Sequence, residues 1–424
     1  MLSSPPAHEH AQPARQAQRG VLWTYALNKA GTGVFASLLV IYLTTQRGID
    51  PAFLALAILT AGIAGTVAGI PLGGVADRFG ARRIYMATLG FEAAASVVII
   101  LAFNNTLVLV ALLLAEVGAA ASAAAAAPLV RAHGGDRPAV LRAKVRTVSN
   151  VAMAAGAGIA AMVALINHET FYMAALALNT LSFLGAIIVV RKVPSPPRLA
   201  GTVVLRRRFA ILEALTDAPY LVAAVVNGLL GLHTAFLTFL IPLAMVRLDA
   251  EYAWIGPAAL VVNTLVIFTL QVRISRKIST HQAAGWAFLA SGVLLAAAMG
   301  GLVLTYRLEP DLAVLLVVLA VVVLIYSLGE IYSAAGGFEV AFGLAPEGLQ
   351  GQYFGAFNAL FHLGIATGPA LLGWLFFTSH PAGPIALVSF FLVSGLLSPW
   401  LIRWAAKRSH HTPAAIPTGV KENS

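Results

Sequence analysis

Runs of about twenty mostly apolar residues recur along nearly the whole chain and limit what it can fold into. In one of these runs, residues 312–329 carry no charge and are almost all Leu, Val, Ala or Ile. A helix of about 20 apolar residues crosses the hydrocarbon core of a bilayer. Hydrophobic residues form 59% of the chain and charged residues 10%, whereas soluble proteins average about 45–50% and about 25%. The sequence therefore predicts an all-α membrane protein whose surplus apolar surface faces lipid.

Polar and Pro- or Gly-rich breaks divide these runs into twelve expected spans. The spans cover residues 21–45, 52–75, 84–103, 107–130, 147–167, 170–191, 218–246, 253–274, 282–306, 312–343, 352–378 and 384–405. The longest connection follows the sixth span and contains three prolines and three consecutive arginines. We expect five segments: a disordered cytoplasmic tail (1–19), an N-terminal six-helix bundle (20–193), a cytoplasmic linker (194–216), a C-terminal six-helix bundle (217–408) and a second disordered cytoplasmic tail (409–424).

The placement of basic residues predicts the orientation of the chain. Almost all of the 27 Lys and Arg residues fall in the tails and loops on one side, and cytoplasmic loops retain Lys and Arg. Only Arg47, Arg247 and Arg307 fall in the opposite loops, and Lys29 falls within a span. We therefore expect a multi-pass protein of the plasma membrane with both termini in the cytoplasm. The net charge of +10 is a topology signal, and no nucleic-acid partner is expected.

A short repeated pattern suggests that the two halves are related. Asn150 is followed by Gly156 on the fifth span, and Asn358 is followed at the same spacing by Gly364 on the eleventh. Both spans are rich in small residues, which allow helices to pack closely in lipid. The pattern is typical of a duplicated architecture with two pseudo-symmetric six-helix bundles.

A glycine-rich, charged segment, GGVADRFGARR at 73–83, lies between the second and third spans. It resembles the signature G-x-L-A-D-R-x-G-R-[KR]-[KR] of the major facilitator superfamily. The residues that fit are Gly73, Ala76, Asp77, Arg78, Gly80, Arg82 and Arg83. Val75 replaces the usual Leu, and Ala81 replaces a basic residue. The resemblance implies the major facilitator fold and a gating motif that latches the two halves; a basic turn that only sets topology is the alternative.

A second segment is similar to the drug/proton antiporter branch of that superfamily. Gly329-Glu330, then APEG at 345–348 and GQYFG at 351–355, follow the pattern G-E…A-P-E-x-x-R-G-x-x-x-G, with Gln350 in place of Arg. The fifth span departs from the branch, because Gly156-Ala157-Gly158 lacks the Gly-Pro motif common there.

Ionisable residues within spans are candidate site residues, because a charge at mid-bilayer costs roughly 2.5–3.5 kcal/mol on insertion scales. In the facilitator fold, the first and fourth helices line the central cavity, so we expect Lys29 and Glu116 to face it and to interact. A static ion pair that fixes packing is the alternative. Glu330 on the tenth span and Glu92 on the third are further protonation candidates. The expected site, for proton coupling or substrate, is Lys29, Glu116, Asn28, Glu330, His233 and Asn358.

No other chemistry is encoded in a recognisable motif. The chain has no cysteine, which excludes thiolate metal sites and thiol catalysis. No phosphate-cradling loop, zinc-protease motif or serine elbow is present. We therefore expect no cofactor, no metal and no enzymatic activity, with energy supplied by a gradient or by a partner.

The expected function is secondary active transport of a small amphipathic or drug-like solute, through proton-coupled efflux by alternating access. The expected partners are that solute, protons as the coupling ion, and the lipid bilayer, and the chain is expected to act as a monomer. A nutrient or sugar symporter is the nearest alternative. A lipid or lysolipid transporter and a non-transporting sensor on the same fold also remain open.

Overall fold

The computed structural model describes residues 7–134, 138–195, 216–345, 350–378 and 380–409. Within these residues, twelve helices are long and apolar enough to cross a membrane, which confirms the predicted all-α membrane fold. The first half contains α1 (Ala7–Ile41), η1 (Tyr42–Gln46), α2 (Pro51–Phe79), α3 (Ala81–Leu101), α4 (Asn105–His133), α5 (Pro138–Ile166) and α6 (Glu169–Val190). The second half contains α8 (Ala218–Gly231), η2 (Leu232–Thr234), η3 (Phe236–Leu240), α9 (Ile241–Leu248), η4 (Ala250–Trp254), α10 (Ile255–Ser275), α11 (His281–Leu308), α12 (Leu312–Gly343), α13 (Gln350–Phe377) and α14 (Ala382–Ser409).

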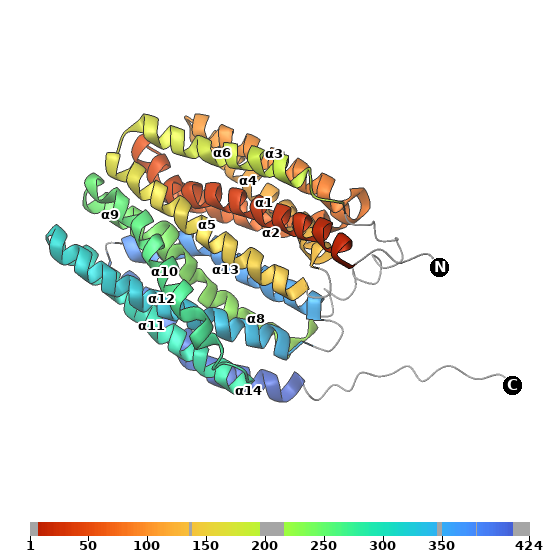
Figure 1. Ribbon diagram of the computed structural model, residues 1–424. Coiled ribbons are helices and arrows are strands. Elements are labelled where there is room, and N and C mark those ends of the chain that lie inside the picture. The colour runs from red at the N-terminus through yellow and green to blue at the C-terminus, as the bar shows by residue number, and fades with distance from the viewer. Residues whose placement is uncertain (1–6, 135–137, 196–215, 346–349, 379, 410–424) are drawn as a thin grey trace, which may run out of the picture.

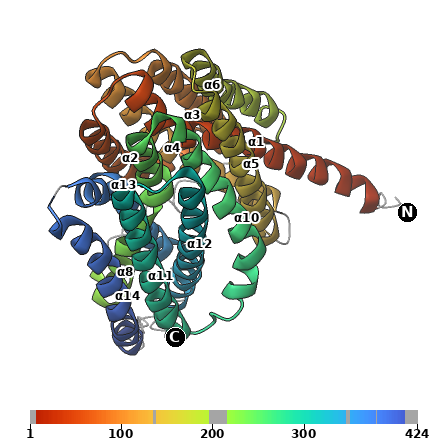
Figure 2. The same cartoon turned by 90° about the vertical axis from the view of Figure 1, so that its left-hand side faces the viewer.

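The two halves have the same helix packing. In the first half α1 packs against α5 and α6, α4 against α2 and α3, and α3 against α6. In the second half α8 packs against α13 and α14, α12 against α10 and α11, and α11 against α14. Each contact in one half therefore has its counterpart six spans later. Figures 1 and 2 show the halves side by side, the first in red to yellow and the second in green to blue.

Glycines set the closest of these contacts. A Cβ atom placed on Gly156 of α5 would collide with the carbonyl oxygen of Ala30 on α1 and lie 2.8 Å from the amide nitrogen of Val34. A Cβ on Gly364 of α13 would likewise collide with the carbonyl oxygen of Gly228 on α8. The two glycines singled out by their spacing thus do the same work in the two halves, as the repeat predicts.

The halves meet through a small set of helices. α2 packs against α13, α5 packs against α10 and η4, and α1 touches α9, η3 and α10. A Cβ on Gly62 of α2 would collide with Cβ of Ala366 on α13, so this contact too depends on a missing side chain. The contact of the second span with the eleventh (α2 with α13) is the symmetric counterpart of the contact of the fifth with the eighth (α5 with α10). These two contacts place a pseudo-twofold axis between the halves.

The seventh span is interrupted near its middle. α8 gives way to the 3-10 turn η2 and the π-helical turn η3 before α9 completes the span. The hydroxyl of Tyr326 on α12 donates to the carbonyl of His233 at 3.2 Å, and the ring of Tyr326 stacks on Phe236. The break is therefore held by the neighbouring helix, as irregular backbone within a membrane requires.

The first helix is longer than expected. α1 begins at Ala7, so the described part of the segment 1–19 is helical, whereas a disordered tail was predicted there. Ala, Glu, Gln and Arg dominate this stretch and are strong helix formers. Gln18 also donates to the carbonyl of His133 at 2.9 Å, which ties the helix to the end of α4. Most of the expected linker (194–216) and the C-terminal tail from residue 410 lie outside the described residues.

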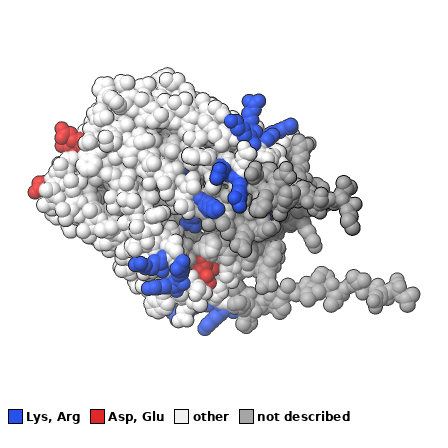
Figure 3. Space-filling model, in the orientation of Figure 1, with Lys and Arg blue, Asp and Glu red and all other residues white. Residues whose placement is uncertain are grey.

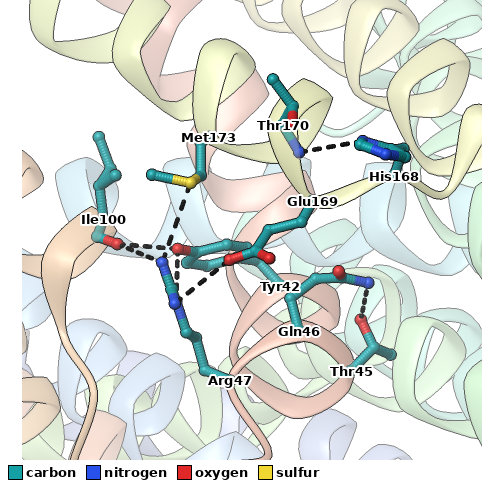
Figure 4. Close-up of polar contacts among 9 residues, drawn as sticks. All are labelled: Tyr42, Thr45, Gln46, Arg47, Ile100, His168, Glu169, Thr170 and Met173. Atoms are coloured by element: carbon teal, nitrogen blue, oxygen red, sulfur yellow. Dashed lines mark hydrogen bonds and ion pairs between the residues drawn. The ribbon is translucent and has the colours of Figure 1, made fainter.

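An arginine joins three elements at the end of the first half that lies away from the termini (Figure 4). Arg47 donates from Nε to the hydroxyl of Tyr42 at 2.7 Å and from Nη2 to the carbonyl of Ile100 at 3.0 Å. Its Nη1 lies 3.3 Å from Glu169. Tyr42, which is fully buried, also donates to Ile100. This cluster links η1, the end of α3 and the start of α6.

The described charged side chains are distributed unevenly. Figure 3 shows Lys and Arg gathered toward the end from which both termini leave, with an acidic group beside them, and further acidic groups at the opposite end of the same face. The chain enters and leaves at one end because the number of spans is even.

Two neighbouring glycines of α5 provide a test of the packing. We expect Gly156→Ala to cost about 1–3 kcal/mol of stability, because overpacking displaces α1. Gly158→Ala is the matched control, since a Cβ there would meet nothing within 4 Å and Ala is the better helix former. The midpoint of thermal unfolding in detergent, with size-exclusion chromatography as the readout, compares the stability of the two variants. Equal midpoints for the two would contradict the packing.

The Arg47 cluster predicts unequal effects for its two charged partners. Arg47→Ala should cost about 1–3 kcal/mol, because hydrogen bonds to the buried Tyr42 hydroxyl and the Ile100 carbonyl are lost. Glu169→Gln should cost less than about 1 kcal/mol, because exposed ion pairs contribute little and the Glu169 side chain is 50% exposed. The same unfolding assay compares them. A larger loss for Glu169→Gln would show that the ion pair dominates.

Candidate substrate and coupling site

Lys29 and Glu92 form the charged centre of the first half. Lys29, on α1, is half-buried and interacts electrostatically with Glu92 of α3. Glu92 is itself half-buried in the middle of its span. The expected partner of Lys29 was Glu116; the carboxylate that lies close enough to act on Lys29 electrostatically is that of Glu92. No ion pair joins Lys29 to either acid among the described residues.

Hydroxyl groups support Glu92 from the neighbouring turns. The hydroxyl of Ser122, on α4, donates to a carboxylate oxygen of Glu92 and lies 2.8 Å from the hydroxyl of Thr88. A Cβ on Gly118 would lie 2.9 Å from Cγ of Glu92, so the glycine makes room for the acid. Buried carboxylates need such partners, and here α4 supplies them.

Asn28 extends this polar centre along α1. Its side chain is buried and accepts a hydrogen bond from the hydroxyl of Thr32 at 3.2 Å. Asn28 and Lys29 therefore lie with Glu92 in one polar layer between α1, α3 and α4.

Glu116 has a different environment. Its side chain is exposed on the spanning part of α4, where its backbone carbonyl lies against Gly65 of α2. Its charged neighbour is Glu92, a group of the same sign. An exposed carboxylate in a span favours contact with a water-filled path over contact with lipid.

Glu330 is the corresponding acid of the second half. It is half-buried on α12, the tenth span, whereas the exposed Glu116 lies on α4, the fourth. The buried amide of Asn263, on α10, donates to Oε2 of Glu330 at 2.9 Å and to the hydroxyl of Ser327 at 3.0 Å. The carboxylate is thus held by the helix that packs against the first half.

A basic residue of the first half lies near this acid. Arg146, exposed near the start of α5, is close enough to Glu330 to act on it electrostatically. α5 packs against α10, so the two groups come near each other at the boundary between the halves, although no ion pair joins them among the described residues. Arg146 was counted in the sequence only as a topology signal.

His233 lies inside the second half. It is buried at the break of the seventh span, with Nδ1 2.8 Å from the hydroxyl of Tyr326. Both groups serve the interrupted backbone described above. Tyr326 also interacts electrostatically with Glu330, one turn further along α12. His233 is therefore connected to Glu330 through Tyr326, a residue that was not among the expected site residues.

Asn358 lies on a helix with neighbours in both halves. It is half-buried on α13, which packs against α8 and against α2. The six expected site residues are thus divided among three places. Asn28 and Lys29 lie in the polar layer of the first half, and Glu116 is exposed on α4. Glu330, His233 and Asn358 lie in the second half.

The gating motif forms the end of α2 and the start of α3. Gly73, Asp77 and Arg78 fall in α2, where their side chains lie outside the described residues. Gly80 separates the helices with a φ of 99°, a conformation that favours glycine. Arg82 donates to the carbonyls of Val193 at 2.8 Å and Arg191 at 3.4 Å, and Arg83 is exposed. A cation suits these helix-end carbonyls, so Arg82 ties α3 to the end of α6.

The glycine contacts also reveal which site positions correspond. Gly156 meets Ala30, and Gly364 meets Gly228, so Ala30 and Gly228 are equivalent. The preceding residues, Lys29 and Asn227, are then equivalent as well. One half carries a charge where the other carries a buried amide.

The assignment of Glu92 to Lys29 predicts a specific coupling. Lys29→Met leaves Glu92 without a nearby positive charge. The double variant Lys29→Met with Glu92→Gln should therefore lose less stability than the two single variants together, by about 0.5–3 kcal/mol. Thermal unfolding of the four proteins in detergent measures this cycle. A cycle of Lys29→Met with Glu116→Gln is the control and should be nearly additive. Coupling to Glu116 alone would contradict the geometry.

Comparison with known proteins identifies the family. The profile of the Major Facilitator Superfamily matches residues 21–369. A search of curated protein sequences finds no match. Among solved structures, a variant of the nucleoside transporter NupG is similar with a TM-score of 0.72 at 13% identity, covering 92% of this chain and 99% of that chain. An auto-inhibited POT family peptide transporter is similar with a TM-score of 0.68 at 15% identity, covering 95% of this chain and 99% of that chain.

Likeness at this identity shows the fold alone, and it agrees with the symmetric packing of the two halves. The family match covers most of the chain and includes the charged segment between α2 and α3. Together they indicate a transporter rather than an enzyme. The chain is a member of the major facilitator superfamily.

Proposed function

We propose that the protein is a secondary active transporter that exports small amphipathic or drug-like solutes in exchange for protons. The observation that carries this proposal is the retention of ionisable groups in the spans of both halves: Lys29, Glu92 and Glu116 in the first, and Glu330 in the second. Such groups are costly in a bilayer and mark ion or substrate paths. The resemblance of the segment around Gly329-Glu330 to drug/proton antiporters supports export as the direction of transport.

The mechanism we propose is alternating access. The two halves are pseudo-symmetric bodies that touch through α2–α13 and α5–α10, the arrangement in which one bundle rocks against the other around a fixed site. The first half is braced at one end by Arg47 and at the other by Arg82, which suits a rigid body. The motif from Gly73 to Arg83 is proposed as the gate, and Gly80 as its turn.

We place the protein in the plasma membrane with both termini in the cytoplasm. The support is the gathering of basic side chains at the end that carries the termini (Figure 3), because cytoplasmic ends retain Lys and Arg.

Lipid handling is the second candidate, and one feature favours it. An apolar groove of about 520 Å³ lies between α8 and α14, lined by residues such as Leu229, Phe390 and Leu397. Leu229 and Leu397 are exposed on the spanning surface, so an acyl chain could enter from the bilayer.

A transport assay tests the proposal and its rivals. Purified protein in proteoliposomes should move an amphipathic fluorescent dye when a pH gradient is applied, and much less without one. A nucleoside, a dipeptide, a sugar and a labelled lysolipid serve as the other substrates. Movement of a nutrient down the proton gradient would favour symport, movement of lysolipid alone would favour lipid handling, and binding without any flux would favour a sensor.

Proton coupling through Glu116 is tested by its amide variant. Glu116→Gln should remove the dependence of dye flux on the pH gradient, because the variant side chain cannot exchange a proton. Glu169→Gln, an exposed acid at the end of a span, is the matched control and should keep the dependence. Proton dependence equal to wild type in Glu116→Gln would take Glu116 out of the coupling role and leave Glu92 and Glu330.

A further inference from the structure

The groove between α8 and α14 belongs to the outer, lipid-facing surface of the second half. α14 packs against α11, α8 and α13, three helices of that half, and Figures 1 and 2 show it on the side that faces away from the first half. The groove has a volume of about 520 Å³ and is lined by Val393 and Leu397 of α14, among others. Both side chains are exposed in the middle of a span. The groove therefore opens to the bilayer, apart from the contact between the halves.

The lining of the groove suits a hydrocarbon chain. Its members are Val, Leu, Ala and Phe side chains with two serines, Ser389 and Ser394. The hydroxyl of Ser394 donates to the carbonyl of Phe390 at 2.7 Å, so it is used within its own helix. A polar solute in this groove would leave its hydrogen-bonding groups without partners, whereas an acyl chain has none to satisfy.

The face of α14 that lines the groove continues into a basic segment. Leu401 lines the groove, and Trp404 and Arg408 follow three and seven residues later, a spacing that places them on the same helix face. The guanidinium of Arg408 lies 4.9 Å from the centre of the Trp404 ring. Arg403 and Lys407 are exposed on the neighbouring faces. The groove thus ends beside three basic side chains, where the last turns of α14 reach the end that carries both termini (Figure 1).

No acid neutralises this basic segment among the described residues, because no ion pair there includes Arg403, Lys407 or Arg408. Asp217, at the start of the neighbouring α8, has other partners. One of its carboxylate oxygens accepts from a backbone amide in the first turn of α8 at 3.2 Å, and the other accepts from the hydroxyl of Tyr353 at 3.2 Å. The positive charge at the end of α14 is therefore left to attract an anion.

The headgroup, and not the tail, has to decide which lipid occupies such a groove. An acyl chain that enters it leaves surroundings that are equally apolar, so burial of the tail gives little preference. A Lys or Arg side chain near the membrane surface, by contrast, favours an anionic lipid by about fivefold per residue. Tryptophan is also common at the depth of the headgroups, which is where the position of Trp404 near the helix end would place it.

We propose that α8 and α14 form a binding site for one anionic phospholipid, with an acyl chain in the groove and the phosphate at Arg403, Lys407 and Arg408. The lipid is a resident ligand that covers the surface between the two helices, and it is distinct from the transported solute. The inference holds whichever solute is carried, because the groove lies apart from the contact between the halves.

Two lipids with the same acyl chains and different headgroups test the site. Native mass spectrometry of the purified protein in detergent, titrated with phosphatidylglycerol or phosphatidylcholine, measures the first bound molecule of each. Phosphatidylglycerol should bind at least about tenfold more tightly, because phosphatidylcholine carries no net charge. Its binding should also raise the midpoint of thermal unfolding, since a ligand of the folded state stabilises that state. Equal affinity for the two lipids overturns the proposal.

Removal of two charges locates the headgroup. The double variant Lys407→Gln with Arg408→Gln should weaken the binding of phosphatidylglycerol by at least about tenfold and leave phosphatidylcholine within about twofold. Arg276→Gln with Lys277→Gln is the matched control, because these exposed residues carry the same charges at the end of α10. An equal loss in both double variants would show a general attraction to the positive end of the molecule and overturn the site.

A bulky side chain in the groove tests the position of the tail. Val393→Trp should weaken both lipids alike, because it fills the groove and leaves the basic residues in place. Leu396→Trp is the matched control, since Leu396 is exposed on α14 but does not line the groove. Unchanged binding in Val393→Trp overturns the proposal; if that variant is not monodisperse, the charge variants carry the test.

Two further outcomes would assign the groove to another role. A dimer of the chain that Val393→Trp dissociates, without an effect on phosphatidylglycerol, would show that a second copy occupies the groove. Transfer of labelled phosphatidylglycerol between the leaflets of proteoliposomes, lost in the Lys407→Gln with Arg408→Gln variant, would make the lipid a cargo. Either result overturns the resident lipid.

Discussion

Contact between helix backbones, which glycine alone permits, is the interaction on which the rest of the structure depends. In lipid there is no hydrophobic drive that brings apolar helices together, so packing must supply the attraction. Gly156 against Ala30 and Gly364 against Gly228 give both halves the same tight pair of helices. The pair in the first half is α1 with α5, which carry Lys29 and Arg146. The glycine contact therefore also determines where two of the charges can lie.

The duplicated framework does not carry duplicated charges. Lys29 is matched by Asn227, and the acid of the tenth span is bonded to an amide while that of the fourth is exposed. Lys29 and Glu92 lie near each other within one half, whereas Glu330 is hydrogen-bonded to Asn263 within the other. Function in a symmetric scaffold has to arise from such differences, because equal halves would offer a solute two equal sites.

The sequence predicts those features of the fold that the thickness and polarity of the bilayer determine. Span length is set by lipid, so the twelve spans could be predicted, as could the glycine repeat. The carboxylate that lies near Lys29 could not. Helices that are apolar on every side give no indication of which face turns inward, so the direction of Glu92 was open.

The bond from Arg82 to Val193 has a mechanical consequence. Val193 follows the end of α6, and the predicted linker begins at residue 194. The guanidinium at the start of α3 thus holds the backbone where the chain leaves the last helix of the first bundle. Because Arg82 lies two residues after Gly80, a displacement of Val193 would be transmitted to the turn between α2 and α3.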